Sequence, residues 1–188
     1  MTTAEILLVR HGATEWSATG RHTGRTDIPL SPAGEAAARA LRDRMPAQPA
    51  LVLVSPRQRA IDTCRLAGLG DVAQIDDDLQ EWDYGDDEGL TTPEIRAARP
   101  GWDMWRDGCP NGETSADVGA RADRVVARLG AIESGTAVVF AHGHLLRVLG
   151  ARWAGLPPET GGVLALDPAT VSALGSERER RVIRRWNA

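Results

Sequence analysis

Three short, nearly continuous apolar runs constrain the fold of this chain more than any other feature. Ile6 to Val9, Leu51 to Val54 and Ala137 to Ala141 are rich in β-formers and lack the alternation of a half-exposed strand. Such runs are typical of strands buried on both faces. Because a helical segment follows each one, the chain is predicted to fold as an α/β three-layer sandwich. Its central sheet is expected to be mostly parallel, with helices on both faces.

Helix-start signals recur after the apolar runs. Ser31-Pro32 opens an alanine-rich segment, with serine as the N-cap and proline at the first helical position, and Ser55-Pro56 repeats the signal. From Val118 to Ile132, apolar residues recur at spacings of four, three, four and three, which places them on one helical face. The expected helices are Pro32 to about Met45, residues 56 to 67, Ser115 to about Ser134, and Leu145 to Trp153.

Two regions depart from this alternation. Residues 85–114 are rich in Gly, Asp and Trp and are predicted to pass over one end of the sheet. The tail is predicted to form short strands, broken at Asp167-Pro168 and Gly175-Ser176. These strands are Val163 to Leu166, Val171 to Leu174 and Arg181 to Trp186. No Pro-rich or Ser/Gly-rich linker divides the sequence, so residues 1–188 are expected to form a single domain.

Charge and composition disfavour several classes of protein. The net charge is -4 although all 22 basic residues are arginine, so nothing global attracts nucleic acid or an anionic membrane. Cys64 and Cys109 lack metal-ligand spacing and are expected to be small buried residues. The sequence shows neither a secretory leader nor an apolar run near the roughly 18 residues of a membrane span. We therefore expect a soluble, cytoplasmic protein, for which a homodimer is compatible with the sequence.

Basic side chains follow all three buried strands. The first strand leads into Arg10-His11-Gly12, the second into Ser55-Pro56-Arg57-Gln58-Arg59, and the third into His142-Gly143-His144. In an open α/β sheet, ligands bind beyond the carboxyl ends of the strands. Imidazoles and guanidiniums gathered there predict an anion site. The glycines after His11 and His142 are expected to let the ligand approach the backbone closely.

Phosphoryl transfer is a chemistry that uses these groups. A neutral imidazole is a good nucleophile toward phosphorus, and Arg10 and Arg59 can neutralise the charge on the transferring group. A second imidazole in the same pocket, that of His142, is expected to be protonated and to donate to phosphate. Glu81 is the candidate proton donor for the leaving group, because the neighbouring Trp82 can raise its pKa by desolvation.

A metal site is the main alternative for these residues. His142 and His144 are two positions apart and could bind a cation together with Asp76 to Asp78. The arginines of the same region would repel a cation. The anion site is therefore favoured, with no metal and no cofactor.

In these residues the chain resembles the histidine phosphatase superfamily, whose branches include the cofactor-dependent phosphoglycerate mutases. The resemblance lies in Leu8-Val9-Arg10-His11-Gly12-Ala13-Thr14-Glu15-Trp16, Thr23-Gly24, Asp27, Pro29-Leu30-Ser31, Gly34, Ser55-Pro56-Arg57-Gln58-Arg59-Ala60, Thr63, Glu81, Tyr84-Gly85, Gly112-Glu113-Thr114 and Ala141-His142-Gly143. It implies that His11 is the phosphorylated nucleophile and that Arg10, Arg59 and His142 form the phosphate pocket. It also implies that Glu81 acts as proton donor and then as base for water.

Further contacts to phosphate are implied at the edge of this pocket. Ser17 stands where the family often has asparagine, and its hydroxyl is a candidate donor. Thr23, Gly24 and the backbone N–H of Gly143 are further candidates. Arg147, on the helix after His142, is expected to hold a second anionic group.

Family membership leaves several functions open. Mutase-branch sequences resemble Glu-Arg-x-Tyr-Gly at the acid and carry a longer insertion after it, whereas this chain reads Glu81-Trp82-Asp83-Tyr84-Gly85 and is shorter. We therefore predict a metal-independent phosphatase for small phosphorylated metabolites, with sugar phosphates or bisphosphates as the expected class. The closest resemblance is to sugar bisphosphatases and bacterial acid phosphatases. Residues 85–114 are expected to cover the pocket, with Trp102 and Trp105 packing one helical turn apart. The alternatives are a phosphoglycerate mutase and a catalytically inactive phospholigand-binding module.

Overall fold

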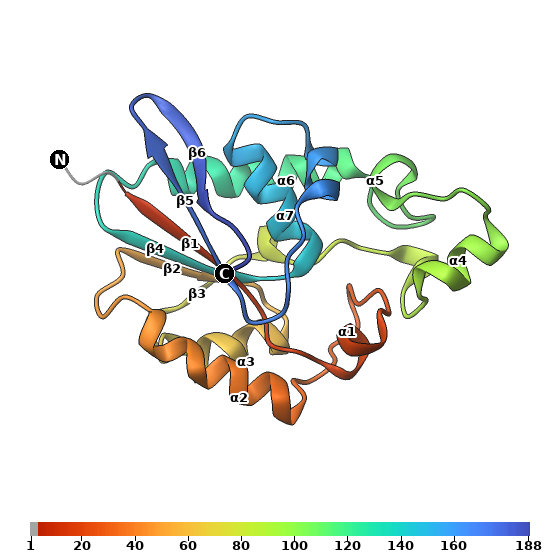
Figure 1. The fold of residues 1–188 in the computed structure, drawn as a ribbon, viewed down its shortest axis with the longest axis horizontal. Helices are drawn as coiled ribbons and strands as arrows, with labels where there is room; N and C mark the ends of the chain where they lie inside the picture. The colour runs from red at the N-terminus through yellow and green to blue at the C-terminus, as the bar shows by residue number, and fades with distance from the viewer. Residues whose placement is uncertain (1–3) are drawn as a thin grey trace.

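A six-stranded sheet forms the centre of the computed structural model, which describes residues 4–188 (Figure 1). Its strand order is β3-β2-β4-β1-β5-β6. The strands are β1 (Glu5–Arg10), β2 (Leu51–Val54), β3 (Gln74–Ile75), β4 (Thr136–Ala141), β5 (Val171–Glu177) and β6 (Arg180–Arg185). The first four run parallel to one another, while β5 and β6 are antiparallel to their neighbours. The predicted mostly parallel sheet is confirmed, and the short edge strand β3 was not predicted.

Successive side chains of the central strands enter two separate hydrophobic clusters. In β1, Ile6 and Leu8 belong to one cluster, and Leu7 and Val9 belong to the other. Side chains of a strand point alternately to opposite faces of the sheet, so both faces must be covered. This explains why the strands read as continuous apolar runs.

Helices cover both faces of the sheet, which confirms the predicted three-layer sandwich. Figure 1 shows α2 (Pro32–Ala40) and α3 (Gln58–Leu66) on one face, and α6 (Ser115–Gly130) and α7 (Gly143–Trp153) on the other. The shorter helices are α1 (Glu15–Thr19), α4 (Thr92–Ala98) and α5 (Met104–Asp107). The 3-10 turns are η1 (Leu41–Arg44), η2 (Gly70–Val72), η3 (Asp77–Leu79), η4 (Gly85–Asp87) and η5 (Pro158–Val163). Over residues 4–188, no helix has the length and apolar character to cross a bilayer.

Several helix boundaries differ from the prediction. Helix α2 ends at Ala40, with η1 continuing to Arg44, and α7 begins at Gly143, two residues before Leu145. Ser31 caps α2 as expected, because its Oγ accepts from the backbone N–H of Gly34 at 3.1 Å. The second Ser-Pro signal does not start a helix at position 56. Helix α3 begins at Gln58, since the Ser55 hydroxyl is hydrogen-bonded within the site described below. Helix α6 ends at Gly130, four residues before the predicted end.

The tail also corrects two predictions. No strand forms at Val163 to Leu166, where a 3-10 turn ends and irregular backbone follows. The carbonyls of Gly161 and Gly162 accept from the Arg147 guanidinium instead. The predicted break at Gly175-Ser176 is absent, because β5 continues to Glu177 while paired with β6. Pairing with a neighbouring strand thus overrides the local turn signal.

Residues 85–114 extend beyond the carboxyl ends of the parallel strands and contain α4 and α5 (Figure 1). A hydrogen-bonded ion pair between Arg99 and the buried Asp87 ties this segment together. Trp102 is buried, and its indole N–H donates to the Gly108 carbonyl at 3.0 Å. Trp102 lies before α5, so it is not one turn from Trp105 on a shared helix, but both residues pack against the core.

Candidate active site

The ends of three neighbouring parallel strands bring the predicted residues together. In the sheet, Arg10 is in register with Ala141, and Val54 with Phe140. The backbone N–H of His11 donates to the Ala141 carbonyl, and that of Ser55 donates to the Phe140 carbonyl, each at 3.0 Å. These bonds continue the ladder past the strand ends. His11, Ser55 and the residue after Ala141, which is His142, therefore lie at one edge of the sheet.

A hydrogen bond to the backbone determines which nitrogen of the His11 ring carries the lone pair. Its Nδ1 lies 2.7 Å from the Gly12 carbonyl, which can only accept, so Nδ1 carries the hydrogen and Nε2 carries the lone pair. Burial and the nearby Arg59 and Arg10 guanidiniums lower the pKa of His11 well below its ordinary value. The ring is thus neutral near pH 7, as a nitrogen nucleophile must be.

His142 packs against His11, with the ring centroids 5.2 Å apart. Its Nε2 lies 2.7 Å from the Ser55 hydroxyl, whereas its Nδ1 is buried without a hydrogen-bond partner among residues 4–188. Burial and Arg59 lower the pKa of His142 well below its ordinary value. The protein therefore opposes the expected protonation, because a low-dielectric environment and the guanidiniums of Arg59, Arg57 and Arg10 act on the ring together. Ser55 was not among the predicted site residues.

The guanidiniums at this edge are anchored by backbone carbonyls and keep one nitrogen free. Arg59 is fully buried and donates from Nη1 to Thr26 O at 3.0 Å and from Nη2 to Thr23 O at 2.9 Å. Arg10 donates through Nη1 to the Leu166 carbonyl. The Nε atoms of Arg10, Arg57 and Arg59 are buried without a partner in the described chain. A buried N–H without an acceptor is costly, so these groups indicate a site for an anion.

Glu81 lies beside this cluster at the start of α7. Its carboxylate accepts from the backbone N–H of Trp82 at 2.9 Å, of His144 at 3.1 Å and of Leu145 at 2.9 Å. The last two donors belong to the first turn of α7, where backbone N–H groups lack helical partners. Glu81 is thus fixed in position by the helix whose N-cap is His142.

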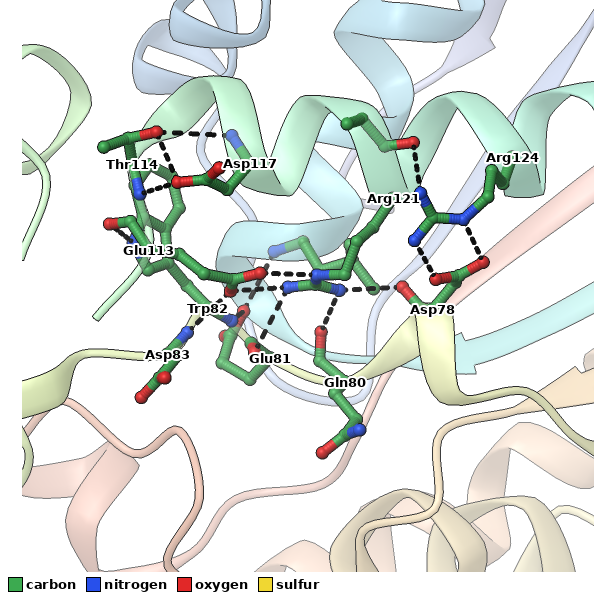
Figure 2. Close-up of polar contacts among 12 residues, drawn as sticks. Asp78, Gln80, Glu81, Trp82, Asp83, Glu113, Thr114, Asp117, Arg121 and Arg124 are labelled. Atoms are coloured by element: carbon green, nitrogen blue, oxygen red, sulfur yellow. Dashed lines mark hydrogen bonds and ion pairs between the residues drawn. The ribbon is translucent and has the colours of Figure 1, made fainter. Parts of the chain in front are cut away.

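An arginine on α6 also fixes the backbone around Glu81 (Figure 2). Arg121, on α6, donates to the carbonyls of Asp78 at 2.8 Å and Gln80 at 3.0 Å, and contacts that of Glu81 at 3.4 Å. It also forms a two-point ion pair with Glu113, at 2.7 and 2.8 Å. Figure 2 shows its guanidinium between the Glu113 carboxylate and this backbone segment. No local signal in the sequence marks Arg121, since its contacts join distant parts of the chain.

A cavity of about 220 Å³ opens at this edge of the sheet. Of the predicted site residues, its lining includes Arg10, His11, Ser17, Thr23, Glu81, Gly143 and Arg147. Arg59 and His142 lie fully buried behind the lining. The lining residues that were not predicted as site residues are Gly20, Arg21, His22, Tyr84, Thr92, His144 and Leu166. Of these, His144 was considered only as a possible metal ligand. Tyr84 appeared only within a motif shared with the family.

Three predicted phosphate contacts have other partners, and one of them is the Thr23 hydroxyl, which donates to Arg21 O at 3.0 Å. The Ser17 hydroxyl donates to Thr14 O at 3.0 Å and accepts from Thr14 N at 2.9 Å, so it closes the first turn of α1. Gly24 does not line the cavity, and its N–H donates to the Glu88 carboxylate. A Cβ at Gly24 would meet Trp82 O at 2.6 Å, so close packing accounts for the glycine.

The glycines after the two histidines also have a packing reason that the sequence analysis did not give. A Cβ at Gly12 would lie 2.5 Å from the carbonyl oxygen of Gly34, which is too close for any side chain. A Cβ at Gly143 would lie 3.3 Å from the Arg10 guanidinium. Gly12 therefore serves the contact between β1 and α2, and it is absent from the cavity lining.

The alternative metal site is not assembled. Asp76 pairs with Arg128 and Asp78 with Arg124, while the His144 ring is hydrogen-bonded to Tyr84. Within residues 4–188, no group of three or more His, Cys, Asp or Glu side chains is arranged to hold a metal ion.

Comparison with known proteins places this site in a family. The model of the histidine phosphatase superfamily (branch 1) matches residues 6–188. An acid phosphatase of Mycobacterium tuberculosis is 42% identical over 176 residues, which cover 92% of this chain and 86% of that protein. A sedoheptulose 1,7-bisphosphatase of Saccharomyces cerevisiae is 39% identical over 186 residues, covering 82% of this chain and 69% of that protein. A solved structure of an open reading frame product from M. tuberculosis has a TM-score of 0.92 at 40% identity, covering 98% of this chain and 97% of the other.

These matches bear on both the fold and the enzyme class. The structural match covers nearly all of both chains, and both named relatives are phosphatases. The predicted class, a phosphoric monoester hydrolase, is thereby confirmed. With its strand-end histidines and a family match over residues 6–188, the chain belongs to the histidine phosphatase superfamily, branch 1.

Proposed function

We propose that this protein is a metal-independent phosphatase that hydrolyses small phosphorylated metabolites, such as sugar phosphates or bisphosphates, through a phosphohistidine at His11. One observation carries the proposal. The His11 imidazole, neutral and with a free Nε2, shares its strand-end edge with Nε of Arg10, Nε of Arg59 and Nδ1 of His142, which are buried without a hydrogen-bond partner in the described chain. The oxygens of a phosphate group would satisfy these donors.

In the first step, the lone pair of His11 Nε2 attacks phosphorus, and the phosphorus–oxygen bond of the ester breaks. The ester oxygen takes a proton from Glu81, acting as the carboxylic acid, and leaves as an alcohol. His11 is then a phosphohistidine and Glu81 a carboxylate. The backbone amides of Trp82, His144 and Leu145 hold the carboxylate in place.

In the second step, water attacks the phosphohistidine and transfers a proton to Glu81. The phosphorus–nitrogen bond breaks, its electron pair returns to His11 Nε2, and inorganic phosphate leaves. Throughout both steps, Arg10 and Arg59 offset the charge on the equatorial oxygens. The buried Nδ1 of His142 also donates to the phosphate. The charge of the bound anion raises the lowered pKa of this ring and so favours its protonation.

The direct test is hydrolysis of 4-nitrophenyl phosphate in EDTA by the wild type and by His11→Ala. The wild type is expected to hydrolyse the ester, and acid-quenched mass spectra during turnover should place one phosphate on His11. The His11→Ala variant should form no phosphoenzyme and lose nearly all activity. Equal activity of the two proteins, or activity that requires a divalent metal, would refute the proposal.

Glu81 is tested by its dependence on the leaving group. Glu81→Gln should slow the hydrolysis of alkyl phosphates by about 100-fold or more, because general acid catalysis contributes roughly 10²–10⁴-fold. The aryl ester needs less protonation and should be affected far less. Glu35→Gln, an exposed change on α2, is the matched control. A uniform loss across leaving groups would contradict the assignment.

The two alternative functions give distinct results. Incubation with 3-phosphoglycerate and a bisphosphoglycerate primer would reveal a mutase by rapid isomerisation with little release of free phosphate. A phospholigand-binding module would form no phosphoenzyme with any ester. The phosphatase proposal expects net release of phosphate and a trapped phospho-His11.

A further inference from the structure

Two imidazoles line the cavity but have no part in the proposed phosphoryl transfer. His22 comes from the loop after α1, and His144 from the first turn of α7. Their rings are stacked within 9° of parallel, with the centroids 6.2 Å apart. The tautomer of each ring decides whether it presents a donor or an acceptor to the cavity, because a neutral imidazole donates from one nitrogen and accepts at the other.

The hydrogen of His144 is fixed by Tyr84. The Tyr84 hydroxyl lies 2.6 Å from His144 Nδ1, which is its one hydrogen-bond partner among residues 4–188. Burial raises the pKa of Tyr84 well above its ordinary value, so the hydroxyl keeps its hydrogen. That hydrogen would be left without an acceptor unless Nδ1 carried a lone pair. His144 is therefore protonated at Nε2, and a quarter of its side-chain surface remains exposed.

The hydrogen of His22 is fixed in the opposite sense. Its Nδ1 lies 2.8 Å from the Leu90 carbonyl, which can only accept. Nδ1 is therefore the donor, which leaves Nε2 as the only nitrogen of the ring that can accept. The stacked rings thus offer one donor, from His144, and one acceptor, from His22.

Packing keeps the His144 ring in this orientation. The rings of Trp82, Tyr84 and Trp105 contact it edge-on, at centroid distances of 6.4, 5.8 and 5.4 Å. Aromatic neighbours on several sides restrict rotation of the ring about its χ angles. The Nε2–H direction is therefore set before any substrate binds.

His144 also lies where a leaving group would be. Its Nδ1 is 4.0 Å from Oε2 of Glu81, the carboxyl that would protonate the leaving oxygen. Atoms attached to that oxygen would extend into the part of the cavity lined by His22 and His144. A donor and an acceptor side by side match a hydroxyl group, which both accepts and donates.

We propose that His144 and His22, with their hydrogens positioned by Tyr84 and the Leu90 carbonyl, select substrates whose leaving group carries hydroxyls next to the phosphate ester. The inference rests on the proposed phosphatase function and names the residues that choose among its substrates. A second phosphate would suit this pair poorly, because its oxygens accept and would face the lone pair of His22. Besides Arg10, the arginines of the cavity lining are Arg21 and Arg147, which donate to the backbone carbonyls of Gly89, Gly161 and Gly162.

The test compares two esters that differ in their hydroxyls, sn-glycerol 3-phosphate and n-propyl phosphate. The wild type should have the higher kcat/KM for glycerol phosphate. His144→Phe and His22→Phe should each lower the ratio of the two kcat/KM values about three- to tenfold, the value of one neutral hydrogen bond. Arg124→Ala, on the outer side of α6, should keep the wild-type ratio. A wild-type ratio near one, or a ratio that neither histidine change alters, would overturn the proposal.

Two further measurements separate the possible explanations. Nitrogen NMR of the wild type should show His144 as the Nε2–H tautomer near pH 7, and Tyr84→Phe should release the ring to the other tautomer and lower the same ratio. An Nδ1–H tautomer in the wild type would refute the inference. If His144→Phe lowered kcat/KM equally for propane-1,3-diyl bisphosphate and for glycerol phosphate, the pair would be an anion subsite. That result would overturn the proposal as well. Failure of the phosphatase function itself is distinct, since no phospho-His11 would then form with any ester.

Discussion

The Arg121–Glu113 pair allows the positioning of Glu81 to be tested by a single substitution. Arg121→Ala removes the two-point ion pair with Glu113 and the donors to two backbone carbonyls beside Glu81. The Arg121 and Glu113 side chains are 15% and 21% exposed, so the remaining Glu113 carboxylate is only partly hydrated. Removing one partner of a buried pair costs about 3–5 kcal/mol, and partial exposure places this pair near the lower end. We expect a loss of about 3 kcal/mol in the free energy of unfolding.

The same helix provides a matched control. Arg124, one turn from Arg121, pairs with Asp78 through a side chain that is 59% exposed (Figure 2). Pairs of this kind contribute roughly 0.2–1 kcal/mol. Urea unfolding of Arg121→Ala and Arg124→Ala should therefore differ by about 2 kcal/mol or more. Equal losses for the two variants would refute the argument from burial.

Activity distinguishes positioning from general stability. If Arg121 holds Glu81 in place, Arg121→Ala should slow alkyl phosphates more than the aryl ester, as Glu81→Gln does. Arg121→Lys keeps the charge but lacks the planar two-point fork, so it should recover stability only in part. An equal decrease for both ester classes in folded Arg121→Ala would show that the arginine supports the fold without orienting the acid.

Three other predictions follow from the site and the packing. Folding lowers the pKa of His11, His142 and His144. At a pH below about 6.5, the ordinary pKa of histidine, the unfolded chain therefore binds more protons than the folded protein. Stability should therefore fall as the pH drops below about 6.5, by up to roughly 4 kcal/mol per pH unit, and urea midpoints unchanged between pH 7 and 5.5 would contradict this. Ser55→Ala removes the hydrogen-bond partner of His142 and should cost about 1–3 kcal/mol by urea unfolding and lower kcat, whereas unchanged values would argue against it. Gly34→Ala would place a Cβ 2.1 Å from a backbone carbonyl oxygen and should cost at least about 1–3 kcal/mol, so a wild-type melting temperature would contradict the packing.

The sequence predicts those parts of the fold that depend on local patterns. The continuous apolar runs predict β1, β2 and β4, because strands buried on both faces consist almost entirely of apolar residues. They also predict the edge of the sheet at which these three strands end. The two Ser-Pro pairs show where prediction from local sequence fails. Ser31 caps α2, but the Ser55 hydroxyl hydrogen-bonds His142, which lies 87 residues away in sequence. No local signal distinguishes the two serines.

The same reasoning explains which site residues sequence analysis found. Strand ends predict the neighbourhood of His11 and His142, since parallel strands finish at one edge. His22 and Arg121 escape notice, because their partners, Leu90 and the carbonyls before Glu81, come from segments distant in sequence. Long-range hydrogen bonds leave no periodicity to detect.

The chemistry of the cavity depends on hydrogen positions that composition cannot reveal. All four histidines of the chain lie at this site, yet each has a different partner. A backbone carbonyl next to Nδ1 of His11, and another next to Nδ1 of His22, makes Nδ1 the donor and leaves Nε2 as the nitrogen that can accept. A tyrosine hydroxyl makes the Nε2 of His144 a donor. The atom placed 2.6 to 2.8 Å from Nδ1 thus decides whether Nε2 of the neutral ring accepts, as in His11 and His22, or donates, as in His144.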